Sequence, residues 1–249
     1  MRLSSSLAAG AGLLLTQPAF AQGPRAANPE RPTVATHAYA VAPGYVELEQ
    51  GLSARGRRSL GEQTSWDLNL KIGLTRHLQL GLFGPAYLRT DGGAGVGDFG
   101  AALKARGDLS PKVAAALVSA VSMPTGSAAN GLGAGRALGS FVGVVSAELR
   151  GGIHLDANAG PTGIGAGAPQ WFGSVALSRA FGRLSIATEL FAFANGGAGP
   201  AQRGALGSLL LTLAEWAVAD VGGVVGLSDA SPDQVFVGLT TNFGAIMRR

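Results

Sequence analysis

The chain has 249 residues, of which 47% are hydrophobic and 14% are charged, with a formal net charge of +4. Soluble domains carry about 25% charged residues, so this composition argues against an ordinary soluble protein, and the scattered basic residues provide no patch for nucleic acid. The absence of cysteine excludes disulfides and thiolate metal sites, and the 40 glycines argue against an all-α fold, because glycine weakens a helix by about 1 kcal/mol relative to alanine.

The N-terminal residues contain the three parts of a secretory signal peptide in their usual order. Arg2 provides a positive charge, Leu7 to Leu15 form an apolar run, and Ala19-Phe20-Ala21 is a cleavage pattern. Residues 1–21 are therefore predicted to be a cleaved signal peptide. Residues 22–43 follow; they are rich in Pro, Ala and Arg and lack periodicity, which predicts a flexible periplasmic leader, with a strand that the pattern does not reveal as the alternative.

From Gly44 onward, apolar and polar residues alternate with a period of two, the pattern of a strand with two different faces. One face of the clearest segment holds Trp66, Leu68, Leu70, Ile72 and Leu74. The pattern predicts twelve strands, near residues 44–54, 63–75, 78–90, 97–107, 113–124, 138–150, 153–161, 170–181, 184–194, 205–216, 220–228 and 234–243. Residues 44–243 are thus predicted to form the domain, with a C-terminal tail at 244–249.

The connections between these segments alternate in length. Tight turns such as Arg76-His77 and Gly182-Arg183 alternate with longer polar or glycine-rich loops such as 125–137 and 195–204. Short turns at one end and long loops at the other are typical of a transmembrane antiparallel up-and-down β-barrel, here of about twelve strands. A soluble β-sandwich, or a periplasmic lipocalin-like barrel with an apolar interior, is the alternative. A helical membrane protein is disfavoured, because Glu215 and Asp220 interrupt the longest apolar stretch.

Strand parity divides the polar residues from the lipid-facing ones. The residues predicted to line the lumen are Glu47, Glu49, Asp67, Asn69, Lys71, Lys104, Arg106, Glu148, His154, Asp156, Asn158 and Glu189. Large aromatic residues near strand ends are expected at the membrane interfaces. The predicted aromatic girdle consists of Trp66, Tyr87, Trp171 and Trp216.

Few residues are candidates for chemistry. His154, Asp156 and Asn158 share one strand face, and a metal site or a hydrolase centre could be imagined there. A hydrogen-bonded polar wall explains them better, because the chain has no G-x-S-x-G or HExxH motif. No catalytic, cofactor-binding or metal-binding residue is predicted, and the protein is not expected to be an enzyme.

Several short motifs occur in the order found in one family of barrels. They are Gly73 to Gly81, Gly95-Val96-Gly97-Asp98, Pro124-Thr125-Gly126 with Gly131, Gly133 and Gly135, Glu189-Leu190-Phe191, and Ser231-Pro232-Asp233. From Tyr45 to Phe243 the chain resembles the "MetA-pathway of phenol degradation" family of outer-membrane transporters. The resemblance implies a barrel with a transport role and no catalytic residues. Only the family's name suggests aromatic or hydrophobic solutes.

These observations lead to one expected function and two alternatives. The expected function is an outer-membrane channel for small solutes. Its expected partners are outer-membrane lipids, the solute and, during biogenesis, the barrel-assembly machinery; no nucleic acid and no cofactor are expected. The alternatives are a closed structural or adhesive barrel and a membrane-embedded hydrolase.

Overall fold

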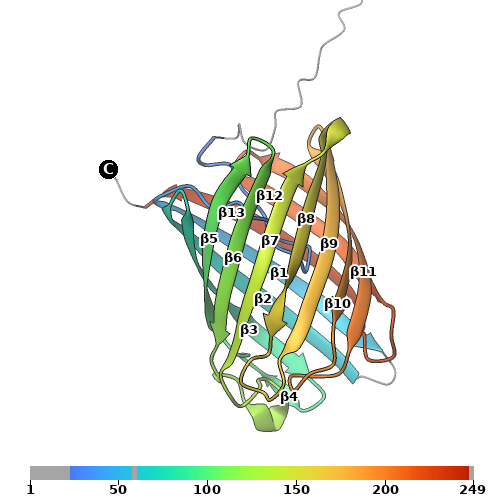
Figure 1. The fold of residues 1–249 in the computed structure, drawn as a ribbon. Coiled ribbons are helices and arrows are strands. Elements are labelled where there is room, and N and C mark those ends of the chain that lie inside the picture. Colours follow the sequence, from blue (N-terminus) through green and yellow to red (C-terminus); the bar gives the residue numbers. More distant parts are fainter. Residues whose placement is uncertain (1–22, 58–60, 247–249) are drawn as a thin grey trace, which may run out of the picture.

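The computed structural model describes residues 23–57 and 61–246, and the predicted signal peptide lies outside them. Within these residues the chain forms twelve long strands and one short strand, which close into a barrel (Figure 1). The long strands are β1 (Tyr45–Arg57), β2 (Gly61–Thr75), β3 (Leu78–Thr90), β5 (Gly100–Ser110), β6 (Val113–Ser122), β7 (Leu138–Glu148), β8 (Ile153–Thr162), β9 (Gln170–Phe181), β10 (Leu184–Phe193), β11 (Gln202–Ala214), β12 (Ala217–Gly226) and β13 (Asp233–Ala245). The short strand is β4 (Gly93–Gly95).

The long strands are antiparallel to their neighbours, and β1 pairs with both β2 and β13. The second of these pairings closes the sheet, so the prediction of an antiparallel barrel of about twelve strands is confirmed. The only helical elements in the described part of the chain are two 3₁₀ turns, η2 (Ala128–Asn130) and η3 (Arg150–Gly152). No helix in that part is long and apolar enough to cross a membrane.

The strand ends differ from the prediction in a few places. β4 has only three residues, none of them large and apolar, so it gave no alternating pattern. β13 continues to Ala245, two residues into the predicted tail. β5 begins at Gly100 rather than near residue 97, because Gly97 and Asp98 make loop contacts described below.

The outer face of the barrel is apolar and the inner face is largely polar. On β13, Val235 and Val237 are 64% and 51% exposed, whereas Phe236 between them is 7% exposed. The inner faces of β1 and β2 bury Glu47, Glu49 and Lys71. A soluble sandwich would bury its apolar face instead, so this arrangement fits a barrel that spans a membrane.

Two neighbouring residues of β2 allow a test of the two faces. Leu70 pairs with Leu48 and Leu82 on the outer face, while Asn69 pairs with Glu49 on the inner face. Leu70→Arg is expected to cost about 2–4 kcal/mol if the residue faces lipid near mid-depth. Asn69→Arg is expected to be tolerated, because its side chain meets polar groups. Heat-modifiable gel mobility of the two variants measures this difference, and equal losses would contradict the assignment of faces.

The two ends of the barrel also differ. In Figure 1 the short turns, with η3, lie at the top, and the long loops, with η2, lie at the bottom. Tyr45 pairs with Ala245, so the two ends of the strand region meet at the short-turn end. In an outer-membrane barrel that end faces the periplasm and the long loops face outward.

The four predicted girdle residues are all exposed. Trp66 pairs with Tyr87 across β2 and β3, and Trp171 is the second residue of β9, so these three lie toward the long-loop end. Trp216 lies in the turn between β11 and β12, at the short-turn end. Their role as a girdle stays a prediction.

Candidate functional site

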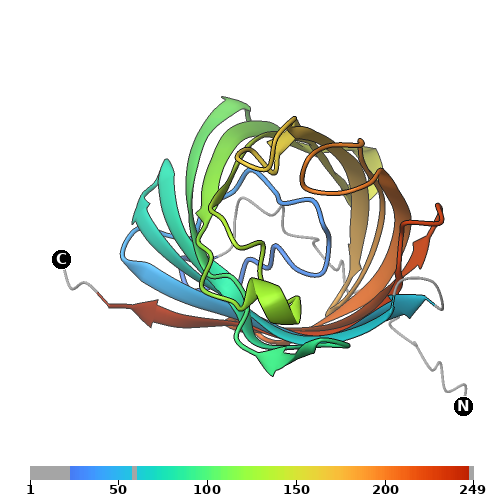
Figure 2. The ribbon, with the colours of Figure 1, turned by 90° about the horizontal axis from the view of Figure 1, so that it is seen from below.

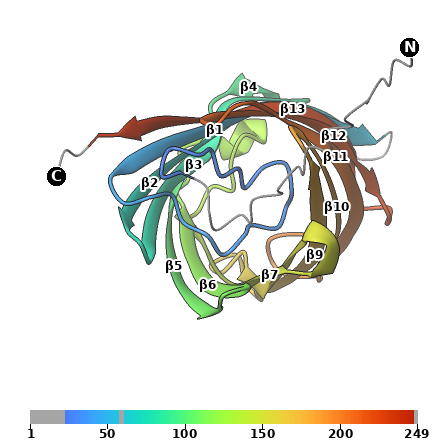
Figure 3. The same cartoon turned by 90° about the horizontal axis from the view of Figure 1, so that it is seen from above.

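The segment from Gly23 to Gly44, called the inner segment below, lies inside the barrel. Figures 2 and 3 show it as a blue loop within the ring of strands. This placement corrects the prediction of a flexible periplasmic leader. The backbone N–H groups of the segment donate to side-chain acceptors on the wall, and so satisfy donors that would otherwise be buried without partners. These acceptors are Glu47, Glu49, Glu189, Asn158, Ser146 and Gln79.

Buried ion pairs fix the inner segment to strands β1, β2 and β5. Lys71 Nζ lies 2.6 Å from Glu47 Oε1 and 2.6 Å from Glu49 Oε1. Glu30 of the inner segment lies 2.6 Å from Lys104 Nζ and 3.9 Å from Lys71 Nζ, measured from its Oε1. Glu30 therefore joins the two ammonium groups into one cluster of three carboxylates and two lysines.

This cluster affects the protonation of two residues of the inner segment, Glu30 and His37. Burial opposes the ionisation of Glu30, but Lys104 and Lys71 outweigh it and hold the pKa of its carboxyl below the usual range. Burial, together with the Lys104 ammonium, lowers the pKa of His37 to about 4. At neutral pH Glu30 is therefore an anion and His37 is neutral, so the segment brings one negative charge to the two lysines.

The next residue of the inner segment, Arg31, contacts β12 and β13, which adjoin β1. Arg31 Nη2 lies 3.4 Å from Asp220 Oδ1, and the Arg31 guanidinium lies over the Phe236 ring, 5.9 Å from its centroid. Glu30 contacts β2 and β5, whereas the Val34 and Ala35 N–H groups donate to Glu189 on β10, so the segment spans the lumen from wall to wall. Asp220 was not assigned to the lumen from the sequence, because its face of β12 also carries Val218 and Val224, which hid the alternation.

The remaining predicted lumen residues lie on either side of this segment. Arg106 donates to the Ala38 carbonyl at 3.2 Å, and the Asn158 amide donates to Thr36 O at 2.9 Å. Asp67 and Asn69 line a cavity of about 230 Å³ together with Glu30 to Thr36. A second cavity of about 640 Å³ lies between the two ends of the inner segment and the wall. It is lined by Pro24, Tyr39 and Arg106 among others.

Glu148, His154 and Asp156 form a hydrogen-bonded row next to Ala38 and Tyr39 of the inner segment. His154 Nδ1 lies 2.8 Å from Glu148 Oε1, and its Nε2 lies 3.1 Å from Asp156 Oδ1. The Ser146 hydroxyl donates to Asp156 and accepts the Ala38 N–H at 2.7 Å. Carboxylates thus engage both ring nitrogens, which leaves neither to act as a base on a serine. In the described residues, no group of three histidine or acidic side chains is placed to hold a metal ion.

An inward-facing apolar surface lies toward the long-loop end of β9 to β13, and sequence reasoning missed it. This aromatic wall consists of Phe172, Phe191, Phe193, Leu206, Val224 and Phe236. Phe191 and Phe193 share the parity of Glu189, which points inward to the Val34 and Ala35 N–H groups at 2.7 Å. That shared parity was the available signal; it was overlooked because apolar residues were assigned to the lipid face.

The phenyl rings of the aromatic wall lie against one another and against the sheet. Phe172 and Phe193 stack with centroids 4.8 Å apart, and Phe191 meets Phe193 edge-on at 6.3 Å. A Cβ atom on Gly204 would lie 2.3 Å from the Phe191 ring. Glycine at this position therefore lets the ring lie flat on the neighbouring strand. Phe191 and Phe193 remain partly exposed.

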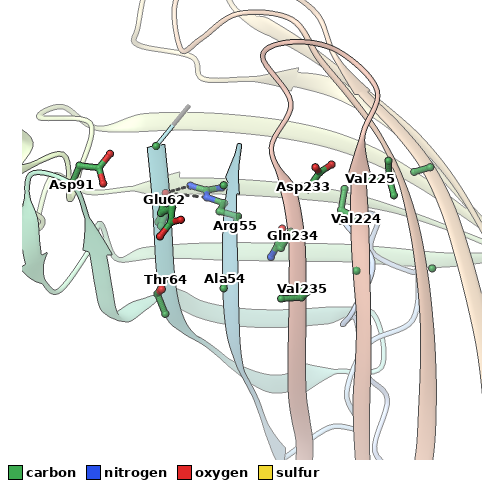
Figure 4. Close-up of a pocket in the computed structure, with 16 residues that line it drawn as sticks. Ala54, Arg55, Glu62, Thr64, Asp91, Val224, Val225, Asp233, Gln234 and Val235 are labelled. Carbon is green, nitrogen blue, oxygen red and sulfur yellow. Dashed lines mark hydrogen bonds between the residues drawn. The ribbon is translucent and has the colours of Figure 1, made fainter. Parts of the chain in front are cut away.

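A further concavity of about 1110 Å³ lies apart from the inner segment. Figure 4 shows it at the long-loop ends of β1, β2, β12 and β13. Its lining includes Val225 and Val235, which are 61% and 64% exposed on the outer wall. Ala54 pairs with Val235 on that same outer face. The groove thus lies mainly on the outside of the barrel.

No family model matches the chain, so its resemblance to the phenol-degradation family stays a prediction, and no curated protein matches it. Solved structures do match. The COG4313 outer membrane channel from Pseudomonas putida F1 has a TM-score of 0.62 at 15% identity, over 82% of this chain and 97% of that chain. The KdgM porin, solved alone and in complex with disordered oligogalacturonate, has TM-scores of 0.55 and 0.57 at 8% and 7% identity, over 79% of this chain and 99% of that chain in each case. The chain therefore has the fold of these outer-membrane barrels.

Proposed function

We propose that this protein is an outer-membrane channel for small solutes that carry an aromatic or hydrophobic group. The observation that carries the proposal is the aromatic wall, which faces the lumen rather than lipid. The proposal includes location in the outer membrane and assembly by the barrel-assembly machinery. The fold shared with a channel and a porin supports it.

An apolar surface inside a hydrated lumen favours an apolar guest. Removing apolar area from water stabilises a complex by about 25 cal/mol per Å², and a well-placed aromatic contact adds about 0.5–1.5 kcal/mol. Phe191 and Phe193 are the partly exposed rings of the wall, so they are available to a solute. The adjoining polar groups around Arg31 and Asp220 suit the polar end of the same solute.

The inner segment defines the next step on the path. A solute held at the aromatic wall meets the segment at Arg31, which contacts both Asp220 and the Phe236 ring. Passage toward the periplasmic end requires the solute to move past this segment or the segment to shift. We therefore assign the aromatic wall to solute capture and the inner segment to control of passage.

Liposome swelling tests the capture step with two zwitterions of similar size, L-phenylalanine and L-glutamine. Changing Phe191 and Phe193 to serine is expected to slow L-phenylalanine uptake about fivefold for each aromatic contact of ~1 kcal/mol that is lost. L-Glutamine uptake should stay unchanged. Phe181→Ser, on the outer face where Phe181 is 52% exposed, is the matched control. Equal slowing of both solutes, or no effect on either, would contradict the capture role.

A closed structural barrel is the second candidate, and the contacts of the inner segment favour it. The segment is bonded to β5 through Glu30 and to β10 through Val34 and Ala35, on two sides of the lumen. Under this alternative, neither zwitterion would enter liposomes that contain the wild-type protein. The same swelling experiment therefore separates the two functions.

A further inference from the structure

Two glycine-containing motifs that are far apart in the sequence meet at the outer end of the barrel. The first is Gly95 to Asp98, before β5, and the second is Pro124 to Gly126, after β6. The Asp98 carboxylate accepts the Gly126 N–H at 2.9 Å and the Ala134 N–H at 2.7 Å. One side chain thus holds both the start and the end of the loop that follows β6.

Thr125, in the second motif, also binds the chain at the first motif. Its hydroxyl accepts the Phe99 N–H at 2.8 Å and donates to the Gly97 carbonyl at 2.9 Å. The loop of residues 123–137 and the segment that leads into β5 are therefore joined by four hydrogen bonds that involve Asp98 and Thr125. We call these two side chains the clasp.

Close packing beneath the clasp fixes the shape of the loop. Leu132 is 4% exposed, although it lies in a loop at the barrel end. A Cβ atom on Gly126 would lie 2.2 Å from Leu132 O, and one on Gly133 would lie 2.2 Å from Asp98 Oδ1. A side chain at position 126 would clash with backbone, and one at position 133 would displace the Asp98 carboxylate. Thr90 adds an outer contact, because its hydroxyl donates to Asn130 O at 2.9 Å.

The clasp lies beside a short stretch of strand pairing. β3 pairs with β5 only from Leu78 to Phe83, opposite residues 105 to 100. Beyond Phe83, the edge of β3 pairs with β4 at Leu88 to Thr90. In this stretch the loop reaches across β5 toward β3. Figure 2, which views the barrel from the long-loop end, shows the loop (green) lying within the ring of strands.

We propose that Asp98 and Thr125 hold loop 123–137 folded over the outer mouth of the barrel, and that this fixed loop sets the size limit for solutes. The size limit rests on the proposed channel function, whereas the clasp itself does not. Asp98 and Thr125 act through the loop, so they are positioning residues. Losing them frees the loop to move away from the mouth, and larger solutes then reach the aromatic wall.

Labelling of a buried loop position tests the clasp without any transport. Leu132→Cys is made in the wild-type background and together with Asp98→Ala, Thr125→Val or Asp229→Ala. A bulky water-soluble maleimide is expected to label the Asp98→Ala and Thr125→Val proteins at least tenfold faster than the others. Asp229 is an exposed acid in a different long loop, so its variant is the matched control. Unchanged labelling in both clasp variants, with normal heat-modifiable mobility, would overturn the clasp.

Liposome swelling with a graded series of sugars tests the size limit on the same variants without the cysteine. Asp98→Ala and Thr125→Val are expected to admit a larger sugar than the wild type and Asp229→Ala. Faster labelling with an unchanged size limit would overturn the role of the loop in selection. If no protein of the set admits any solute, the channel function fails and the size limit fails with it, while the labelling rates still decide the clasp.

Discussion

Removal of residues 23–41 is expected to raise the single-channel conductance of the refolded barrel several-fold. These residues occupy the lumen from the Glu30 contact with Lys104 on β5 to the Val34 and Ala35 contacts with Glu189 on β10. Eight strands leave room only for side chains and about sixteen leave a water-filled channel, so a twelve-stranded barrel gains most of its free cross-section when an inner segment leaves. The charged groups left behind face the lumen and can be hydrated.

A single substitution makes the same test sharper. Glu30 is the residue of the inner segment that pairs with Lys104 and approaches Lys71. Glu30→Ala is expected to lengthen the open state, because Lys104 then keeps only hydroxyl and carbonyl partners from the segment. Glu62→Ala, an exposed acid beside the outer groove, should leave the recordings unchanged. Planar-bilayer recordings of the three variants and the wild type measure both effects.

Two outcomes would contradict this account. If the shortened chain conducts no better than the wild type, the inner segment does not limit passage. If Glu62→Ala lengthens the open state as much as Glu30→Ala, the effect belongs to net charge and not to the buried contact.

The strands could be predicted because lipid imposes a simple rule on them. On β2, every second residue from Trp66 to Leu74 must be apolar, and this alternation also gave the strand's length to within a few residues. The alternation of short turns with long loops then gave the strand count and the antiparallel order. These signals are local, so one sequence suffices to read them.

The inner segment could not be predicted because its contacts are neither local nor periodic. Its backbone N–H groups donate to Glu47, Glu189 and other acceptors that lie as many as 155 residues away. A segment rich in Pro and Ala with no period looks like a leader in isolation. Parity did assign four of the six acceptors, Glu47, Glu49, Asn158 and Glu189, to inward faces. Nothing in the sequence indicated that the chain's own N-terminal part would fill the space between them.

The clasp could be predicted only in part, because its contacts are also not local. The Gly95–Asp98 and Pro124–Gly126 motifs were recognisable as motifs, yet their meeting depends on the gap between β3 and β5. Gly84, with a φ of 151°, packs closely against residues 98 and 99 at this gap. Period-two reasoning assumes continuous pairing, so it extended the strand through residues 97 to 99 and missed the loop contacts made there.

Lys71→Met is expected to destabilise the barrel by about 3–5 kcal/mol, the usual cost of removing one partner from a buried ion pair. Lys71 is the ammonium within 2.6 Å of both Glu47 and Glu49, whose side chains are 0% and 2% exposed. Without it, two buried carboxylates lie side by side on the inner face of β1. Lys112→Met, in an exposed turn, is the control and should cost almost nothing.

Removing the orphaned charges separates electrostatics from packing. When Glu47→Gln and Glu49→Gln are combined with Lys71→Met, most of the lost stability is expected to return, because the glutamine oxygens can still accept the N–H groups of Asn28 and Glu30. Urea unfolding in lipid vesicles, followed by tryptophan fluorescence, measures all three proteins. If Lys71→Met costs no more than Lys112→Met, the cluster contributes nothing to the fold. If the triple variant stays as unstable as Lys71→Met, the loss comes from the packing of the lysine stem. Glu47 is paired with Lys71 in the β1–β2 register. Recovery of stability in the triple variant would therefore show that this register does not depend on the ion pair. Outward-facing apolar side chains and backbone pairing would then be enough to keep it.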